Sequence, residues 1–123
     1  MSKKSEEFIK AMLNLIPLSI SEYRKSIEFN SEVLETVIIE DVFMPQILNL
    51  LSYNTDANLL KRIFDYFEEV SNSEDSYLLN IFSVTVLEIL GNDRTILEIA
   101  NNYMGPKTRQ LQVQVDKDLG RFV

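Results

Sequence analysis

Between residues 59 and 70, apolar side chains recur at steps of three and four, and this spacing constrains the fold more than any other feature of the chain. The apolar positions are Leu59, Leu60, Ile63, Phe64, Phe67 and Val70. Such a period places them on one face of an amphipathic helix. Asp56 or Thr55 can cap the beginning of this helix, and the run Ser71-Asn72-Ser73 ends the pattern.

Residues 75–90 are apolar on nearly every side and have almost no polar face. A helix of this kind is predicted to be the most deeply buried element of the fold. Its β-branched residues would also suit a strand, but about sixteen residues is long for a strand. Gly91 is typical of a helix end, and the following Asn92-Asp93 begins a short helix that runs as far as Tyr103.

Two more helices are predicted near the N-terminus. The first covers residues 5–16 and is separated from the second by Pro17. The second opens with a capping box, in which Ser19 is followed three residues later by Glu22, and it continues through Phe29.

Prolines divide the remaining chain. A segment begins at Ser31, and Pro45 must end or kink it while opening a helix through Leu51. Gly105 followed by Pro106 is the strongest break after that, with the proline suited to the first turn of a last helix.

The last segment has two interpretations. Residues 110–115 alternate between polar and apolar side chains, which is a strand pattern, yet Leu111, Val115, Leu119 and Phe122 also fit one helical face. We choose the helix, because no other segment offers a partner strand. The sequence therefore predicts an all-α fold, with residues 1–123 forming a single domain of about six to eight helices packed as antiparallel helix pairs.

Charge is unevenly distributed along the chain. Residues 27–100 carry fourteen acidic side chains and three basic ones, a local balance of −11 in a chain of net charge −7. This acidic block repels phosphate and attracts Lys/Arg-rich surfaces, so it favours a basic protein partner over direct binding of nucleic acid. The last helix is basic, and we expect Arg109, Arg121, Lys107 and Lys117 to cap carbonyls or to pair with acidic helices of the same molecule.

Composition argues against an enzyme. The chain has no His and no Cys, so it lacks the commonest general base, the commonest metal ligand and any disulfide. Three glycines leave no phosphate-binding loop, and no calcium-loop motif is present. We expect no catalytic residues, no metal site and no cofactor. There is no apolar run long enough to span a membrane and no convincing signal peptide, so we expect a cytoplasmic protein.

The candidate partner-binding residues lie within the acidic block. Asp65, Glu68 and Glu69 fall on the polar side of the amphipathic helix, with Tyr66 as an aromatic anchor. Further candidates are Glu32, Glu35, Glu74 and Asp75. Neighbouring carboxylates on a helix diverge by about 100°, so the adjacent pairs do not suit a metal ion. The competing interpretation of each is an ordinary solvated surface charge.

Two stretches together resemble a family of small, acidic, all-helical bacterial proteins, some of which are found beside polymorphic toxin genes. The first is Leu60-Lys61-Arg62-Ile63-Phe64-Asp65-Tyr66-Phe67-Glu68-Glu69. After the apolar residues 84–90 comes the second, Asn102-Tyr103-Met104-Gly105-Pro106-Lys107-Thr108-Arg109. The resemblance covers roughly residues 31–120.

That resemblance implies an immunity protein, of the contact-dependent growth inhibition type, which binds its cognate toxin domain and covers the active site or the substrate-binding surface. Many toxins of this class are basic nucleases, which the acidic block would complement. The resemblance carries over no catalytic residue. The alternative is a non-catalytic helical-repeat adaptor that binds a basic protein or peptide.

Overall fold

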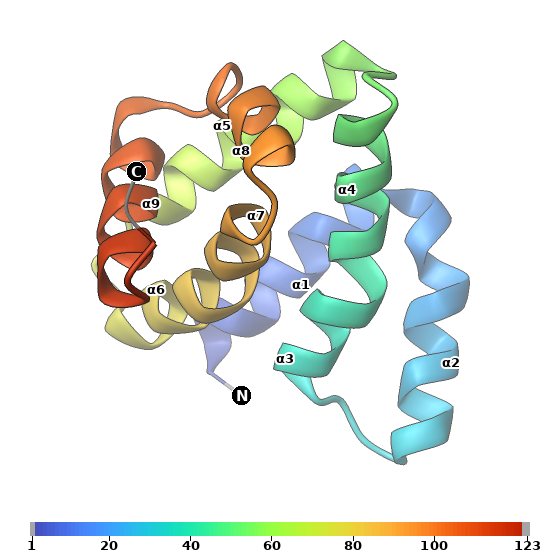
Figure 1. The fold of residues 1–123 in the computed structure, drawn as a ribbon. Helices are drawn as coiled ribbons and strands as arrows, with labels where there is room; N and C mark the ends of the chain where they lie inside the picture. Colours follow the sequence, from blue (N-terminus) through green and yellow to red (C-terminus); the bar gives the residue numbers. More distant parts are fainter. Residues whose placement is uncertain (1, 122–123) are drawn as a thin grey trace.

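The computed structural model describes residues 2–121, which form seven continuous helical segments and no strand (Figure 1). They are α1 (Lys3–Leu15), α2 (Ile20–Asn30) after a 3-10 turn (Pro17–Ser19), α3 (Glu35–Ile38) joined to α4 (Met44–Ser52) by a π turn (Ile39–Phe43), α5 (Ala57–Ser71), α6 (Ser76–Phe82) joined to α7 (Glu88–Gly91) by a π turn (Ser83–Leu87), α8 (Arg94–Asn101) and α9 (Pro106–Asp118). The predicted all-α domain is confirmed, and the ambiguous residues 110–115 are helical. Phe122, which the sequence places on the last helix, lies outside the described residues.

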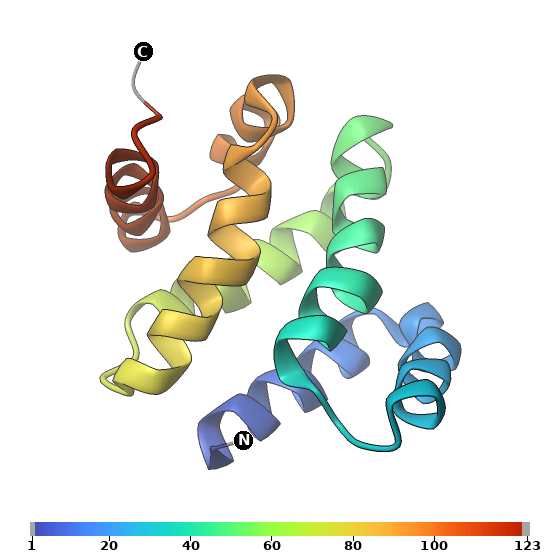
Figure 2. The same cartoon turned by 60° about the horizontal axis from the view of Figure 1, so that its bottom comes forward.

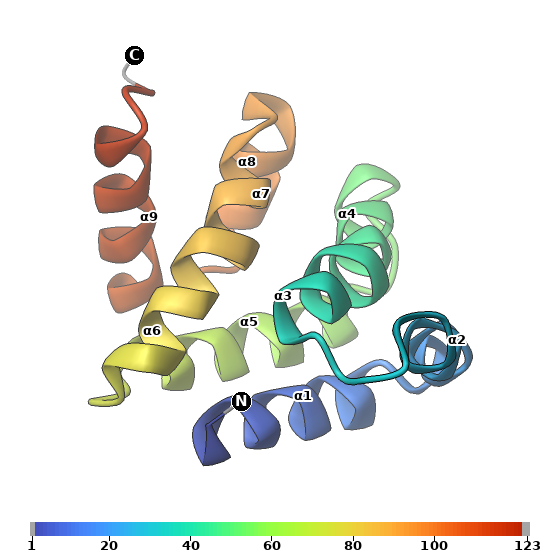
Figure 3. The same cartoon turned by 90° about the horizontal axis from the view of Figure 1, so that it is seen from below.

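Helices α1 and α5 form the base of the molecule. They contact each other and run in opposite directions (Figure 3). Helix α2 likewise runs antiparallel to the helix of residues 35–52, which it contacts at the π turn (Figure 1). That helix, the helix of residues 76–91 and α9 all rise from the base, and α9 contacts both α5 and the second of these helices.

The helices of residues 35–52 and 76–91 lie side by side and run in the same general direction (Figure 2). Each contains a π turn, and the two π turns contact each other, so the wide turns lie where the helices meet. In the first, the Met44 N–H donates to Ile39 O directly before Pro45. A wider turn accommodates a proline without ending the helix, so Pro45 interrupts the α-geometry but the helix continues to Ser52.

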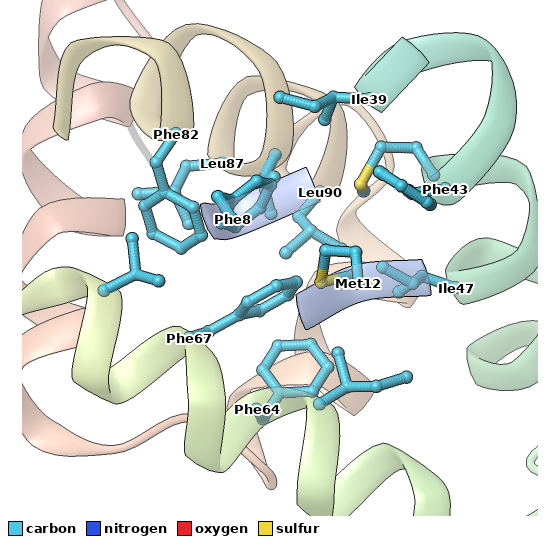
Figure 4. Packing of buried hydrophobic residues seen from close by; sticks show 14 of the residues in the cluster. Phe8, Met12, Ile39, Phe43, Ile47, Phe64, Phe67, Phe82, Leu87 and Leu90 are labelled. Atoms are coloured by element: carbon cyan, nitrogen blue, oxygen red, sulfur yellow. The ribbon is translucent and has the colours of Figure 1, made fainter. Parts of the chain in front are cut away.

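The core lies between the base and these two helices. Phe67 of α5 packs edge-on against Phe64 and Phe82, with ring centroids 5.1 and 5.2 Å apart, and Phe8 of α1 packs against Phe82 at 6.3 Å (Figure 4). All four rings are at most 2% exposed. Aromatic rings of this size contribute much of the buried apolar area and favour the edge-to-face geometry seen here.

Three local predictions are wrong. The capping box is not formed, because the Ser19 hydroxyl donates to Ile16 O at 2.6 Å in the 3-10 turn and makes no bond to the first turn of α2. Ser31 does not begin a helix but ends α2 in a left-handed conformation, and the next helix begins at Glu35. Residues 75–90, predicted to be the most deeply buried element, have one open side, since Val84 is 41% exposed.

Within residues 2–121, none of the helices combines the length and the apolar character needed to cross a membrane.

Candidate partner-binding surfaces

Helix α5 presents two of the predicted carboxylates to solvent. Asp56 caps the helix by accepting from Leu59 N at 3.1 Å, as the sequence predicted, and the apolar face then turns toward the core. Asp65 and Glu69, one turn apart, are both exposed. Asp65 pairs with Lys61 at 2.7 Å, and an exposed pair of this kind contributes little to stability. A basic partner can therefore replace Lys61 at small cost.

Tyr66 lies between these carboxylates and the core. Its ring stacks on Phe8 with centroids 5.9 Å apart, and it lines a hollow of about 170 Å³ together with Lys4, Glu7 and Glu69. Burial, Glu69 and Glu7 raise the pKa of the Tyr66 hydroxyl to about 12. The hydroxyl is therefore protonated at neutral pH and can donate a hydrogen bond. A half-buried ring fixed by packing, with a hydroxyl that can donate, suits an interface anchor.

Glu68, also predicted to bind a partner, is only half-exposed, and its carboxylate has a structural role that the sequence did not indicate. Its Oε2 accepts from Lys107 N at 3.1 Å, and its Oε1 accepts from Thr108 N at 2.9 Å and from the Thr108 hydroxyl at 2.8 Å. Glu68 thus caps the N-terminus of α9. A carboxylate is favoured there because the first backbone N–H groups of a helix have no partner within it and carry partial positive charge.

The local sequence makes room for this cap. Gly105, the residue before α9, supplies no capping side chain of its own, and a Cβ on it would come within 2.5 Å of Glu68 Cδ. Burial of the Glu68 carboxylate acts to raise its pKa, but the hydrogen bonds from Thr108, Lys107 and Asn72 outweigh this effect and hold the pKa below its usual value. The element from Gly105 to Thr108 is therefore explained by helix capping.

The remaining predicted acids fall into two groups. Asp75 is the N-cap of α6 and accepts from Leu78 N at 2.8 Å, so it also has a structural role that the prediction of a binding residue did not include. Glu35, at the start of α3, accepts a hydrogen bond from the Tyr77 hydroxyl, and this bond raises the pKa of Tyr77. Glu32 and Glu74 are exposed. The contact between Glu35 and Tyr77 brings the beginnings of α3 and α6 together.

Helix α9 is held to the body by polar side chains. Thr108 and Gln112, one turn apart, are both buried. The Gln112 amide donates to Leu87 O at 2.9 Å, and Arg121 donates to Glu88 O at 3.0 Å. Arg109 similarly donates to Asn101 O at 2.8 Å, which confirms that basic residues of this segment cap carbonyls.

Gly91 lies against this polar contact, and a side chain there would displace the ends of the neighbouring polar side chains. A Cβ on Gly91 would come within 2.6 Å of Asp116 Oδ1 and of Arg121 Nη1, and within 3.0 Å of Gln112 Nε2. Its φ is not among the positive values of the described residues, so the predicted glycine helix end has a different cause. The helix ends there, and Asp93 caps α8 by accepting from Thr95 N and Ile96 N, as predicted.

Because the polar side of α9 faces the body, its predicted apolar face is left partly open. Leu111 and Val115 are half-buried and Leu119 is 46% exposed. They face the helix of residues 76–91 across a groove of about 350 Å³. The groove is lined by Leu79, Asn80, Ser83, Val84, Glu88, Leu111, Gln114, Val115, Asp118 and Leu119. The sequence prediction missed this groove, although it had identified both apolar faces that line it.

Two further apolar residues are highly exposed. Phe29, near the end of α2, is 89% exposed, and Leu18, in the 3-10 turn before α2, is 85% exposed. Single exposed hydrophobic side chains are common in folded proteins, so these two mark no site by themselves.

Among the described residues there is no group of three or more acidic side chains that could hold a metal ion.

Comparison with known proteins places the chain in a family. Residues 9–119, from α1 to just beyond α9, match a family model described as "Domain of unknown function (DUF7674)". Comparisons with curated proteins and with solved structures found no match. The matched region includes the Glu68 cap, the hydrogen bond from Gln112 to Leu87 O and both walls of the groove. Since it covers most of the sequence, this chain belongs to the DUF7674 family.

Proposed function

We propose that this chain is a bacterial immunity protein, which binds a cognate toxin domain in the cytoplasm and neutralises it by covering the active site or the substrate-binding surface. The toxin domain is basic, as expected of a nuclease. The observation that carries the proposal is the exposed acidic surface around Tyr66, formed by Glu7, Asp65, Tyr66 and Glu69, which we call the Tyr66 surface. The resemblance of residues 31–120 to small acidic bacterial proteins, some of them found beside toxin genes, noted in the sequence analysis, also supports it.

The chemistry of the Tyr66 surface favours Arg or Lys side chains. Exposed carboxylates accept charge-assisted hydrogen bonds, and a guanidinium can bind a carboxylate through two parallel bonds. Glu7 and Asp65 are paired with Lys4 and Lys61 at 3.4 and 2.7 Å, but both pairs are exposed and readily exchanged. Glu74 and Glu32 are exposed further candidates, while Glu68 and Asp75 are engaged as helix caps.

Negative charge at this surface would serve association more than stability. Complementary potentials steer a basic partner toward its binding site and raise the association rate, an effect that salt weakens. The Tyr66 ring then supplies apolar contact area at the centre of the charged residues, where interface energy is usually concentrated.

The test uses the protein encoded by the neighbouring toxin gene. Asp65→Lys with Glu69→Lys changes the Tyr66 surface, and Glu40→Lys with Glu98→Lys is a matched control that changes net charge equally at exposed acids elsewhere. We expect the first double variant alone to bind the toxin domain more slowly, with weaker salt dependence, and to lose protection of cells. Equal association rates and equal protection for the two variants would refute this surface. A neighbouring gene that encodes no toxin would refute the function itself.

A further inference from the structure

We propose that the groove between α9 and the helix of residues 76–91 is a docking site for an amphipathic helix of a partner protein. This docking helix has an apolar stripe flanked by Lys or Arg. This inference does not depend on the partner being a toxin. It rests on how α9 is fixed, on what lines the groove and on the charge of its side chains.

The polar contacts of α9 fix the orientation of the helix. Glu68 holds its N-terminus, Gln112 bonds to Leu87 O at the middle, and Arg121 bonds to Glu88 O beyond its end. Turning α9 to bury its apolar face would break hydrogen bonds of buried groups, which is costly because the freed donors and acceptors would lack water. The open groove is therefore a stable feature of the fold.

Both walls of the groove carry apolar side chains among polar ones. Leu79 and Val84 come from the helix of residues 76–91, Leu111 and Val115 come from α9, and Leu119 directly follows α9. Val84 is the second residue of the π turn, and π turns within helices are often found at functional sites. Two helices that present apolar side chains across an open groove suit a third helix, which inserts residues spaced at i, i+3, i+4 and i+7.

The charged side chains of the groove select a basic partner. Of the residues that line it, the charged ones are Glu88 and Asp118, and both are acidic. A helix with Lys or Arg beside its apolar stripe would place positive charge next to them. A second copy of this chain is a poor occupant, because two molecules of net charge −7 would bring like charges together.

The probes are two synthetic helical peptides with the same leucine stripe, one flanked by Lys and one by Glu. Binding is measured by fluorescence polarisation, and the contacted residues are located by amide chemical-shift changes. We expect the Lys-flanked peptide to bind about tenfold or more tightly than the Glu-flanked one at low salt. The shift changes should centre on Val84 and Val115.

Three variants make the test specific. Val84→Gln with Leu119→Gln removes apolar contact without changing charge, and it should weaken the Lys-flanked peptide by about tenfold or more. Val113→Gln is the control, because Val113 lies on α9 and is 53% exposed but does not line the groove. Asp118→Lys, at an exposed position, should weaken the Lys-flanked peptide and strengthen the Glu-flanked one. Unchanged helical circular dichroism confirms the fold of each variant.

The inference is wrong if both peptides bind equally, if neither binds, or if the Val113 variant weakens binding as much as the groove variant. It is also wrong if sedimentation shows a dimer that the groove variant dissociates, since the occupant would then be a second copy.

Discussion

Removing the carboxylate of Glu68 should loosen α9 from α5. In Glu68→Ala, Lys107 N, Thr108 N and the Thr108 hydroxyl lose their acceptor. Water can replace it at Lys107, where the bond is exposed, but less readily at the part-buried Thr108. Loss of a helix N-cap costs about 0.5–2 kcal/mol and of a hydrogen bond to a charged group about 1.5–3 kcal/mol. We expect a loss of about 2 kcal/mol in the free energy of unfolding at pH 7.

The pH dependence of stability separates the contribution of the Glu68 charge from the contribution of its side-chain shape. Because the pKa of Glu68 is lowered in the folded state, its charge stabilises the fold above the unfolded-state pKa, and this contribution is lost as pH falls through the folded-state pKa. Glu68→Gln should therefore be less stable than the parent at pH 7, and the difference should shrink toward pH ~3, below the usual glutamate pKa of about 4.3. Urea unfolding, monitored by circular dichroism, measures the stability of the parent and of Glu68→Gln at each pH.

Two further variants complete the test. Glu69→Gln is the control, since this neighbouring carboxylate is exposed, and it should leave stability nearly unchanged. Gly105→Ala should destabilise the parent because its Cβ would come within 2.5 Å of Glu68 Cδ, but it should cost less in the Glu68→Ala background. If Glu68→Gln costs no more than Glu69→Gln, or if the amides of Lys107 and Thr108 exchange with solvent at parental rates in Glu68→Ala, the capping argument is refuted.

Three other predictions follow from the packing. Phe82→Ala should lower the free energy of chemical unfolding by about 3–5 kcal/mol, because Phe82 is fully buried. Val84→Ala in the same helix should lower it by less than about 1 kcal/mol, and similar losses for the two variants would contradict the assigned burial. In a spectrophotometric pH titration, the difference in tyrosinate absorbance between the parent and Tyr66→Phe reports the ionisation of Tyr66. We expect this difference to appear near pH 12, and its appearance near the usual value of about 10 would contradict the packed ring. Gln112→Ala should cost about 1–3 kcal/mol by leaving Leu87 O without its buried donor, with faster hydrogen exchange in α9 as the check; unchanged exchange would show that the polar contact does not hold the helix.

Local sequence patterns predicted the helices well. The apolar spacing in α5 and the capping residues Asp56 and Asp93 mark elements that the structure confirms nearly to the residue. These signals act over one or two helical turns, because a cap or an amphipathic face depends on neighbours three or four residues away. The same reasoning correctly assigned residues 110–115 to a helix, since no other segment could pair with them as a strand.

Local patterns failed where another contact competed for the same group, or where no element covered an apolar face. The hydroxyl of Ser19 had a nearby carbonyl to bond and therefore did not complete the expected capping box. The near absence of a polar face in residues 75–90 predicted the most deeply buried helix, but α9 packs so that Val84 lines an open groove. A sequence shows that a face is apolar without showing whether another element is present to cover it.

The sequence by itself determined that this chain is all-helical, acidic in its middle and apolar on defined helix faces. Only the tertiary structure decided that Glu68 caps α9 from 39 residues away in sequence, and that α9 rests on its polar side. Both depend on where the helices meet in space. Apolar faces can pack against one another in several orientations. A carboxylate that accepts from free backbone N–H groups, or a buried side-chain N–H that donates to a carbonyl, keeps its hydrogen bond in one orientation only.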